Sequence, residues 1–219
     1  MISRRPLLAA TAGGLLLSAP ALAQLRRGLW FDPTQLPSYT GRLDRWIASP
    51  AGSVERGLLR EGTQFVFPTS EAEALAASIE AGAPICVWGI RARTAAVVMM
   101  LAWARKETEP ANFVERPAWF PVFNPGRERL TLSGRIQMSL LSPQGEPMGV
   151  ILTEPSRAIR LPIAVHAALG DALRNGEEVT AEGLGTRRDG MEAIDAERLG
   201  KDPANLRPIA ALIPTGPAR

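Results

Sequence analysis

The side chains in this sequence that are best suited to bind a ligand are arginines, accompanied by one glutamine and one phenylalanine. A guanidinium presents a planar fork of N–H donors that matches a phosphate or a carboxylate, and an aromatic ring stacks on a base or a sugar. The candidates fall into one group in each half of the chain. They are Arg56, Arg60, Gln64, Phe65, Arg91 and Arg93 in the first half, and Arg157, Arg160, Arg187 and Arg188 in the second. The alternative interpretation is that these arginines are solvated residues at sheet edges.

Two residue counts limit the other chemistry. The chain has one cysteine, Cys86, and one histidine, His166. Zinc fingers, multi-histidine metal sites and catalytic triads with a second histidine need more ligands than these. Cys86 lies in an apolar run, so we expect a buried, inert thiol. His166 falls in a predicted helix, where we expect a surface or partly packed side chain.

Carboxylates and methionines offer weaker candidates. Paired carboxylates can do acid–base work, but Asp189 and Asp195 flank a predicted hairpin strand. Met99 and Met100 are soft metal ligands by type, but a hydrophobic strand explains them better. We therefore expect no catalytic residue, no metal ion and no cofactor, and thus a protein that is not an enzyme.

The candidate residues lie in two copies of one pattern. The stretch "GRLDRWIASPAG" opens at Gly41, and "GRIQMSLLSPQG" opens at Gly134, an offset of 93 residues that becomes 94 after an insertion near Pro155. The identities fall on turn formers and apolar anchors, which a shared backbone keeps. The matching pairs are Gly41/Gly134, Pro50/Pro143, Gly52/Gly145, Leu59/Leu152, Pro68/Pro162, Leu75/Leu169, Gly82/Gly176 and Gly89/Gly183. This predicts two copies of one small domain.

Each copy has the pattern of three strands, a helix and two strands. Alternating and apolar runs between Gly and Pro turns indicate the strands, and Ala-rich segments that end at Gly82 and Gly176 indicate the helices. In the first copy we expect strands at 41–49, 54–60, 63–68, 84–92 and 95–104, and a helix at 71–81 that Thr69 or Ser70 caps. In the second we expect strands at 135–141, 148–154, 158–162, 178–185 and 191–199, and a helix at 163–175.

This order is that of the oligonucleotide/oligosaccharide-binding fold (OB-fold), a five-stranded Greek-key barrel. The predicted fold class is mainly β, with two tandem five-stranded OB-like barrels, each with one helix between strands three and four. OB-folds bind through strands two and three and through the loops that connect strands 1–2 and 4–5. That geometry places the ten candidate residues near the two grooves, although only Phe65 offers a clear stacking platform.

The second copy also resembles exported bacterial OB-fold-like proteins of unassigned function. The residues that carry the resemblance are Pro143, Gly145, Glu146, Gly149, Leu152, Pro162, Gly176, Glu177, Val179 and Gly183. The first copy departs from this pattern at Ser53, Arg56 and Ala83–Pro84. The resemblance spans about residues 36–200; it implies a fold and a binding role, and it transfers no catalytic residue.

The start of the sequence predicts export. Arg4 and Arg5 precede a short apolar run, and Ala21-Leu22-Ala23 is typical of a signal-peptide cleavage site. We expect cleavage after Ala23, no membrane span and a periplasmic product; "SRRPLL" favours the twin-arginine route over ordinary secretion. Cleavage would remove two arginines and lower the formal charge from +3 to +1, which argues against a nucleic-acid binder.

The expected organisation has six parts. They are a signal peptide (1–23), an N-terminal segment (24–40), a first OB-like domain (41–105), a Pro- and aromatic-rich connector (106–133), a second OB-like domain (134–200) and an irregular tail (201–219). Because the connector carries Phe113, Trp119, Phe120 and Phe123, we expect it to be ordered and packed against a barrel rather than to be a flexible linker.

The sequence favours a non-enzymatic periplasmic binding or adaptor protein whose partner is a protein or a small anionic ligand. Two alternatives remain open. One is binding of single-stranded nucleic acid or of an oligosaccharide through the OB grooves. The other is an enzyme that works with carboxylates.

Overall fold

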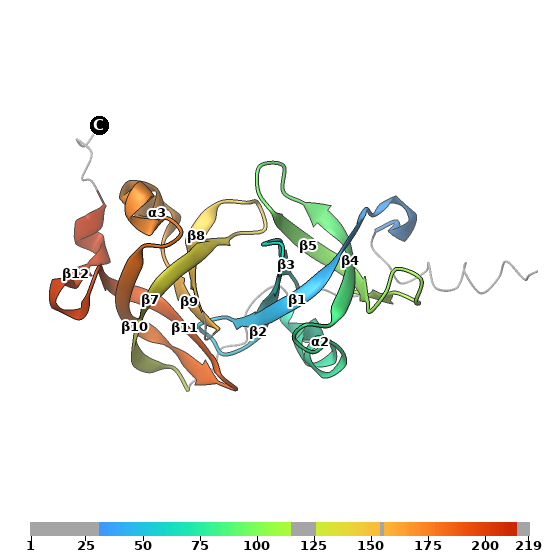
Figure 1. The fold of residues 1–219 in the computed structure, drawn as a ribbon, viewed down its shortest axis with the longest axis horizontal. Coiled ribbons are helices and arrows are strands. Elements are labelled where there is room, and N and C mark those ends of the chain that lie inside the picture. Colours follow the sequence, from blue (N-terminus) through green and yellow to red (C-terminus); the bar gives the residue numbers. More distant parts are fainter. Residues whose placement is uncertain (1–30, 115–125, 154–155, 214–219) are drawn as a thin grey trace, which may run out of the picture.

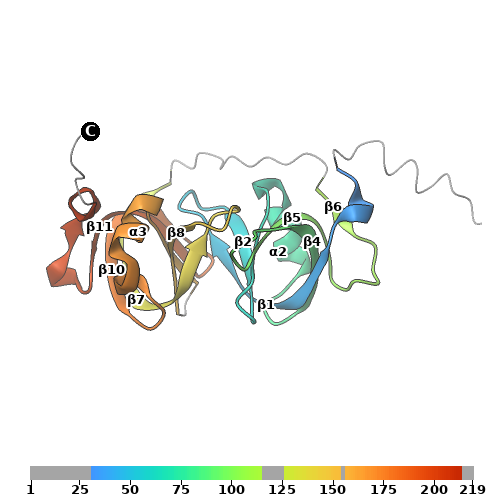
Figure 2. The same cartoon turned by 90° about the horizontal axis from the view of Figure 1, so that it is seen from above.

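The computed structural model describes residues 31–114, 126–153 and 156–213. These residues form two closed β-barrels that lie side by side (Figure 1, Figure 2). Each barrel has five strands and one helix between strands three and four, so the predicted fold class is confirmed. The expected signal peptide lies outside the described residues.

The first barrel closes through a parallel strand pair. Its elements are β1 (Ser38–Ala48), β2 (Val54–Leu59), β3 (Gln64–Val66), α2 (Ala72–Ser78), β4 (Pro84–Arg91) and β5 (Val97–Ala104). The strands are neighbours in the order β3-β2-β1-β4-β5, and β3 pairs in parallel with β5 to complete the circle.

The second barrel repeats this topology. Its elements are β7 (Glu128–Leu141), β8 (Pro147–Leu152), β9 (Arg157–Arg160), α3 (Ile163–Leu169), β10 (Glu178–Arg188) and β11 (Met191–Gly200). The order is β10-β7-β8-β9-β11; β9 runs parallel to β11, and β10 pairs with β11 to close the barrel. β7 begins well before Gly134, inside the segment that we expected to be connector.

The strand register repeats as well as the order. In the first barrel Leu43 pairs with Leu59, and in the second Ile136 pairs with Leu152, an offset of 93 on both strands. Phe65 pairs with Gly57, and Ile159 pairs with Val150, so the third strands are offset by 94. The extra residue lies between β8 and β9, where the sequence comparison places the insertion.

One repeated glycine has a steric cause. The pairing of the fourth and fifth strands contains a β-bulge in each barrel. The extra residue is Leu101 of β5, opposite Trp88–Gly89, and Glu197 of β11, opposite Glu182–Gly183. A Cβ atom at Gly89 would lie 2.1 Å from the carbonyl oxygen of Met99, and one at Gly183 would lie 2.0 Å from that of Asp195. The facing backbone leaves no room for a side chain, so both copies need glycine at this bulge.

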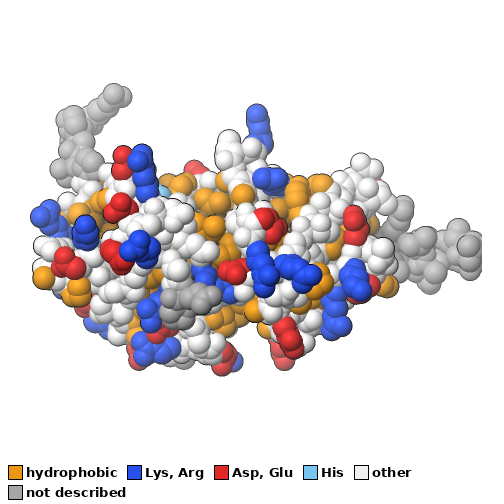
Figure 3. Space-filling view, viewed as in Figure 1, with side chains coloured by type: hydrophobic (Ala, Val, Ile, Leu, Met, Phe, Trp, Pro, Cys, Tyr) orange, Lys and Arg blue, Asp and Glu red, His pale blue; other side chains and the backbone are white. Residues whose placement is uncertain are grey.

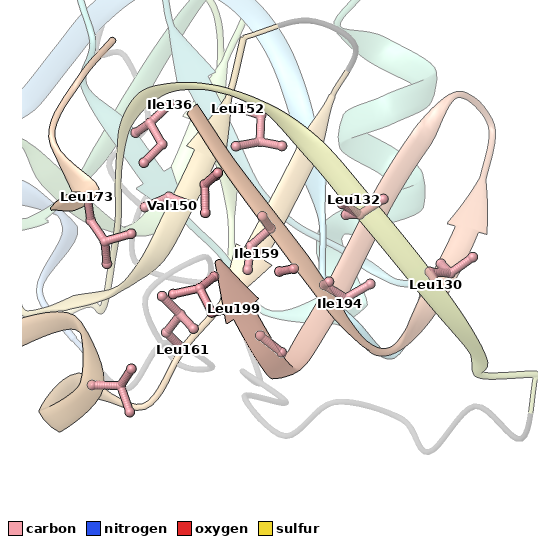
Figure 4. Packing of buried hydrophobic residues seen from close by; sticks show 14 residues of the cluster. Leu130, Leu132, Ile136, Val150, Leu152, Ile159, Leu161, Leu173, Ile194 and Leu199 are labelled. Carbon is pink, nitrogen blue, oxygen red and sulfur yellow. The ribbon is translucent and has the colours of Figure 1, made fainter. Parts of the chain in front are cut away.

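Each barrel encloses its own apolar core. In the second barrel, side chains of β7, β8, β9 and β11 point toward one another, with Ile136, Leu152 and Ile159 fully buried (Figure 4). Full burial of one such side chain contributes about 1.5–3 kcal/mol to folding. In the first barrel, Phe65 fills the equivalent space, and a Cβ at Gly57 would lie 2.2 Å from its ring. The two copies therefore fill their cores with different pairs of large and small residues.

Both helices are shorter than expected. A 3-10 turn, Thr69–Glu71, follows Pro68, so α2 begins at Ala72 with Glu71 as its N-cap residue and without a side-chain capping bond. The expected cap by Thr69 or Ser70 is therefore wrong. α3 ends at Leu169 because Gly170 takes a φ of 44°, and a 3-10 turn, Gly170–Leu173, continues the segment.

The segments around the barrels extend their sheets. β6 (Asn112–Phe113) lies in the expected connector and pairs with β5, and the rings of Phe113 and Phe31 are 6.5 Å apart. Trp119, Phe120 and Phe123 lie outside the described residues. After β11 the chain forms β12 (Arg207–Pro208) and short 3-10 turns. The first residue of the last turn, Ile209, packs against the second core.

Candidate functional site

The two barrels contact each other through equivalent faces. We call this contact the seam; its apolar centre consists of Ile47, Ala48, Leu140, Ile151, Ala158 and Ala193. Ile47 and Leu140 are equivalent in the repeat, since both lie four positions after the matched core residues Leu43 and Ile136. Each barrel thus presents the same side of its first strand to the other.

Polar side chains of the first barrel bind the backbone of the second across the seam. Nη1 of Arg56 donates hydrogen bonds to the carbonyl of Leu141 and to Oε1 of Gln64, both at 2.7 Å. Nε2 of Gln64 donates to the carbonyl of Ser139 at 2.7 Å, and the backbone N–H of Leu141 donates to Oε1 of Gln64. The Gln64 amide therefore supplies β7 with a donor and an acceptor, as a neighbouring strand would.

Further contacts hold the two ends of the seam. Nη2 of Arg45 donates to the carbonyl of Leu152 at 2.9 Å and to the side chain of Gln137. At the other end, the Pro143–Gly145 turn of the second barrel lies against the β4–β5 loop of the first. A Cβ at Gly145 would lie 2.9 Å from that of Ala95. In a single OB-fold, loops of these two kinds would frame a ligand groove; here they pack on each other.

This arrangement corrects our expectation for three of the ten candidate residues. Arg56, Gln64 and Phe65 were expected beside an open groove, but their exposed fractions are 2%, 1% and 1%. Arg56 and Gln64 face the other barrel because the groove face of the first barrel is covered by β7. The ring of Phe65 packs edge-on against Trp46 inside the first core, where no base or sugar can stack on it.

The remaining candidates are dispersed. Arg60, Arg91, Arg93, Arg187 and Arg188 are exposed. Arg157 and Arg187 both donate to Glu192, a buried carboxylate of β11. Burial acts to raise the pKa of Glu192, but the hydrogen bonds and charges of the two arginines outweigh it and lower that pKa. Of the ten candidates, the seam brings together Arg56, Gln64 and Arg160.

Arg160 lies in a recess that residues of both barrels build together. We call it the seam pocket; it has a volume of about 190 Å³ and is lined by Glu55, Arg56, Val66, Phe67, Thr69, Pro143, Met148 and Arg160. Arg160 donates to the carboxylate of Glu55, so an ion pair crosses the seam at this point.

A second recess adjoins the seam pocket and shares Pro143, Met148 and Arg160 with it. We call it the trough; its volume is about 600 Å³, and its other walls are Ser142, Gln144, Glu146, Leu161, Pro162, Ile163, Asp195, Ala196 and Ile209. Its surface is mainly apolar, and Ile163 has an exposed fraction of 45%. Figure 3 shows hydrophobic side chains gathered between the two barrels on the face seen in Figure 1, bordered by charged side chains.

The seam pocket has an unusual charge balance. Its walls contain two guanidinium groups and one carboxylate, that of Glu55. Burial lowers the pKa of Arg56 to about 10; the charge of Glu55 opposes this shift, and the charge of Arg160 adds a smaller lowering effect. Arg56 therefore remains positive at neutral pH. The Nε atoms of Arg56 and Arg160 are buried and lack hydrogen-bond partners within the described part of the chain.

Sequence reasoning missed several residues of this site. Glu55, Met148 and Ile163 line the pocket or the trough, but each is unremarkable in its own copy of the repeat. One signal was present: Arg56 and Gln64 correspond to Gly149 and Ala158 in the second copy. Positions where one copy has a long polar side chain and the other a small residue are candidates for contact between the copies.

Other chemistry on the molecule is limited. Cys86 is buried as expected; burial, with a smaller effect of Glu107, raises the pKa of its thiol to about 11. His166 is more buried than expected, and burial lowers the pKa of its imidazole. Residues 31–114, 126–153 and 156–213 contain no group of three or more His, Cys, Asp or Glu side chains arranged to hold a metal ion. No helix in these ranges is long and apolar enough to span a membrane.

Comparison of the chain with protein-family models, with curated proteins and with solved structures finds no match in any of the three.

Proposed function

We propose that this chain is an exported, non-enzymatic binding protein made of two OB-fold barrels, whose ligand occupies the seam pocket and the trough. A closed five-stranded barrel with a helix between strands three and four supports the OB-fold assignment. The export part of the proposal rests on the signal-like residues 1–23.

The observation that carries the proposal is the joined recess at the seam. Ligand sites are typically concave and mainly apolar, with a few polar groups that fix orientation. The trough supplies the apolar wall, and the seam pocket supplies charged groups that both barrels hold in place. A binding role fits these groups because Arg160 and Glu55 form an ion pair across the seam, which holds both charged side chains in place at the pocket wall.

The seam also bears on the nucleic-acid alternative. In a single OB-fold, strands two and three form the binding face, and here Arg56, Gln64 and Phe65 on those strands are buried. Binding of a single strand would have to use exposed loop arginines such as Arg91 and Arg93. Fluorescence anisotropy of a labelled single strand tests this route: we expect no binding at physiological salt. Binding that persists there and weakens when Arg91 and Arg93 become alanine would replace our proposal.

The trough itself is tested with a neutral apolar fluorophore, N-phenyl-1-naphthylamine, whose emission increases in an apolar site. We expect the purified protein to enhance its fluorescence. Ile163→Asp should weaken binding about tenfold or more, because it places a charge in the apolar wall. Ile90→Asp is the matched control, since Ile90 is at least as exposed, at 52%, and lies outside the trough. Equal effects of the two substitutions, or no enhancement by the unmodified protein, would refute a ligand site in the trough.

A further inference from the structure

We infer that the seam pocket binds the carboxylate of a small amphipathic acid, with the apolar chain of that acid lying in the trough. The inference rests on the proposed function and names the chemical class of its ligand. It follows from three features of the pocket: its charge, its unpaired donors and its connection to an apolar recess.

The net charge of the seam pocket favours a ligand with a single negative charge. Arg56 and Arg160 give the pocket two positive charges, and Glu55 supplies one negative charge. The balance of one positive charge matches one carboxylate. A doubly charged phosphate would leave an excess negative charge in a recess whose neighbouring trough already contains the carboxylate of Glu146. In partly buried surroundings such an excess is costly, because water screens it poorly.

Two arginines in the pocket walls each have a buried Nε donor to which the described part of the protein supplies no acceptor. Buried donors in folded proteins nearly always have a hydrogen-bond partner, so an exception requires an explanation. The Nε atoms of Arg56 and Arg160 are two such exceptions in the described residues, and both side chains line the same pocket. The side chain of Arg56 is held by Gln64 and by the carbonyl of Leu141, so it is fixed before a ligand arrives. A carboxylate is the planar acceptor that suits the guanidinium fork.

The adjoining trough determines what the carboxylate is attached to. Met148 and Arg160 belong to both recesses, so a group bound between the arginines has its substituent directed along Met148. Beyond it, Leu161, Ile163 and Ile209 line the trough. A linear apolar chain fits this path, whereas a highly polar molecule would leave these side chains without apolar partners.

The test is competition against bound N-phenyl-1-naphthylamine by three probes with the same chain: octanoate, octylamine and octanol. We expect octanoate to displace the fluorophore at a concentration at least about tenfold below that of the other two. Arg160→Met should abolish this preference because it removes the net positive charge, while Arg60→Met, on the exposed β2–β3 turn, should leave it intact. Equal displacement by all three probes overturns the inference.

Glu55→Gln gives a second and opposite test. It removes the negative charge of the pocket and frees Arg160 from its ion pair, so octanoate should bind more tightly, by about threefold or more. A purely structural ion pair predicts weaker binding or none when it is broken, and that result would overturn the inference. Circular dichroism checks that each variant is folded.

Two further comparisons show whether the carboxylate comes from a protein C-terminus, and whether a negative result refutes only this inference or also the proposed function. An acetylated pentapeptide that ends in leucine, as the free acid and as the amide, tests whether a protein C-terminus is the source; the ligand is peptide-derived if the acid competes at a lower concentration than octanoate. If the fluorophore binds and responds to Ile163→Asp but octanoate shows no preference, the inference fails and the proposed function stands. If the fluorophore does not bind in the trough, both fail.

Discussion

The two barrels share a fold and a register, but they present opposite chemistry to the seam. At three matched positions the first barrel has long polar side chains and the second has small or apolar ones. The pairs are Arg45 and Met138, Arg56 and Gly149, and Gln64 and Ala158. The first barrel donates hydrogen bonds at these positions, and the second offers backbone carbonyls.

This difference shows what two copies of one domain need in order to pack through equivalent faces. When such faces meet, the residues near the axis that relates them lie close to their own counterparts, as Ile47 and Leu140 do in the seam. Two arginines placed in this way would repel each other, and two glutamines would compete for the same space. Divergence at the polar positions removes the conflict, while the apolar centre and the turn glycines are free to stay alike.

The largest expected effect on stability comes from removing the guanidinium group of Arg56, which donates hydrogen bonds across the seam. Arg56→Ala leaves the buried carbonyl of Leu141 without this donor and removes one of the hydrogen bonds of the Gln64 amide, so we expect a loss of about 3 kcal/mol in the free energy of unfolding. Urea denaturation measures it. Arg60→Ala, at an exposed position four residues on, should change stability by about 0.5 kcal/mol or less. Equal effects of the two substitutions would contradict the role that we assign to Arg56.

Tryptophan fluorescence shows whether Arg56→Ala weakens the seam or only the first barrel. Trp46, Trp88 and Trp103 lie in the first barrel, Trp30 and Trp119 lie outside the described residues, and the sequence from 126 to 213 has no tryptophan, so Trp30→Phe and Trp119→Phe are included in all proteins compared. In the unmodified protein, fluorescence and circular dichroism should report one coincident transition, because the seam couples the barrels. In the variant, the fluorescence transition should come at lower urea than that of circular dichroism, which reports on both barrels.

A smaller effect is expected where the copies are alike. Gly183→Ala places a Cβ against the carbonyl of Asp195 beside the bulge between β10 and β11, and Gly89→Ala places one against the carbonyl of Met99 beside the bulge between β4 and β5. We expect each to cost about 2 kcal/mol by forcing the paired strands apart. Gly134→Ala is the control, because its Cβ would meet only the flexible end of Leu152, at 3.4 Å. A marked difference between Gly89→Ala and Gly183→Ala would show that the two bulges are not equivalent.

The comparison of the two barrels also shows which features of the fold the sequence predicts. Strand order, the repeat and the buried thiol of Cys86 were predictable because turns, periodicity and apolar runs are local properties of the chain. The ends of the helices were less predictable. The helical pattern of residues 163–175 has no break, but Gly170 adopts a positive φ, which ends α3. Local patterns indicate an element more reliably than they indicate its last turn.

The site was less predictable because it depends on contact between distant segments. An arginine on the second strand of a barrel has the same local sequence pattern whether it faces an open ligand groove or another barrel. The sequence of the first copy alone could therefore not show that Arg56 contacts the second barrel. Glu55 and Arg160 are 105 residues apart in sequence, and nothing in either copy indicates that they meet. Only the contrast of Arg56 with Gly149, and of Gln64 with Ala158, carried information about the seam.

The smallest expected effect belongs to a charge cluster on the long β10–β11 hairpin of the second barrel. The pKa of Glu192 is lowered in the folded protein, because the hydrogen bonds and charges of Arg157 and Arg187 outweigh burial. A lowered carboxylate pKa contributes stability above the unfolded value, here 4.5, and that stability is lost as pH falls through the folded value. Glu192→Gln should therefore cost about 1 kcal/mol at pH 7, and the difference from the unmodified protein should shrink toward pH 3. Urea midpoints at pH 7, 5 and 3 measure this, with the exposed Glu128→Gln as control. A difference that stays constant or grows in acid would mean that Glu192 acts through packing rather than through its charge.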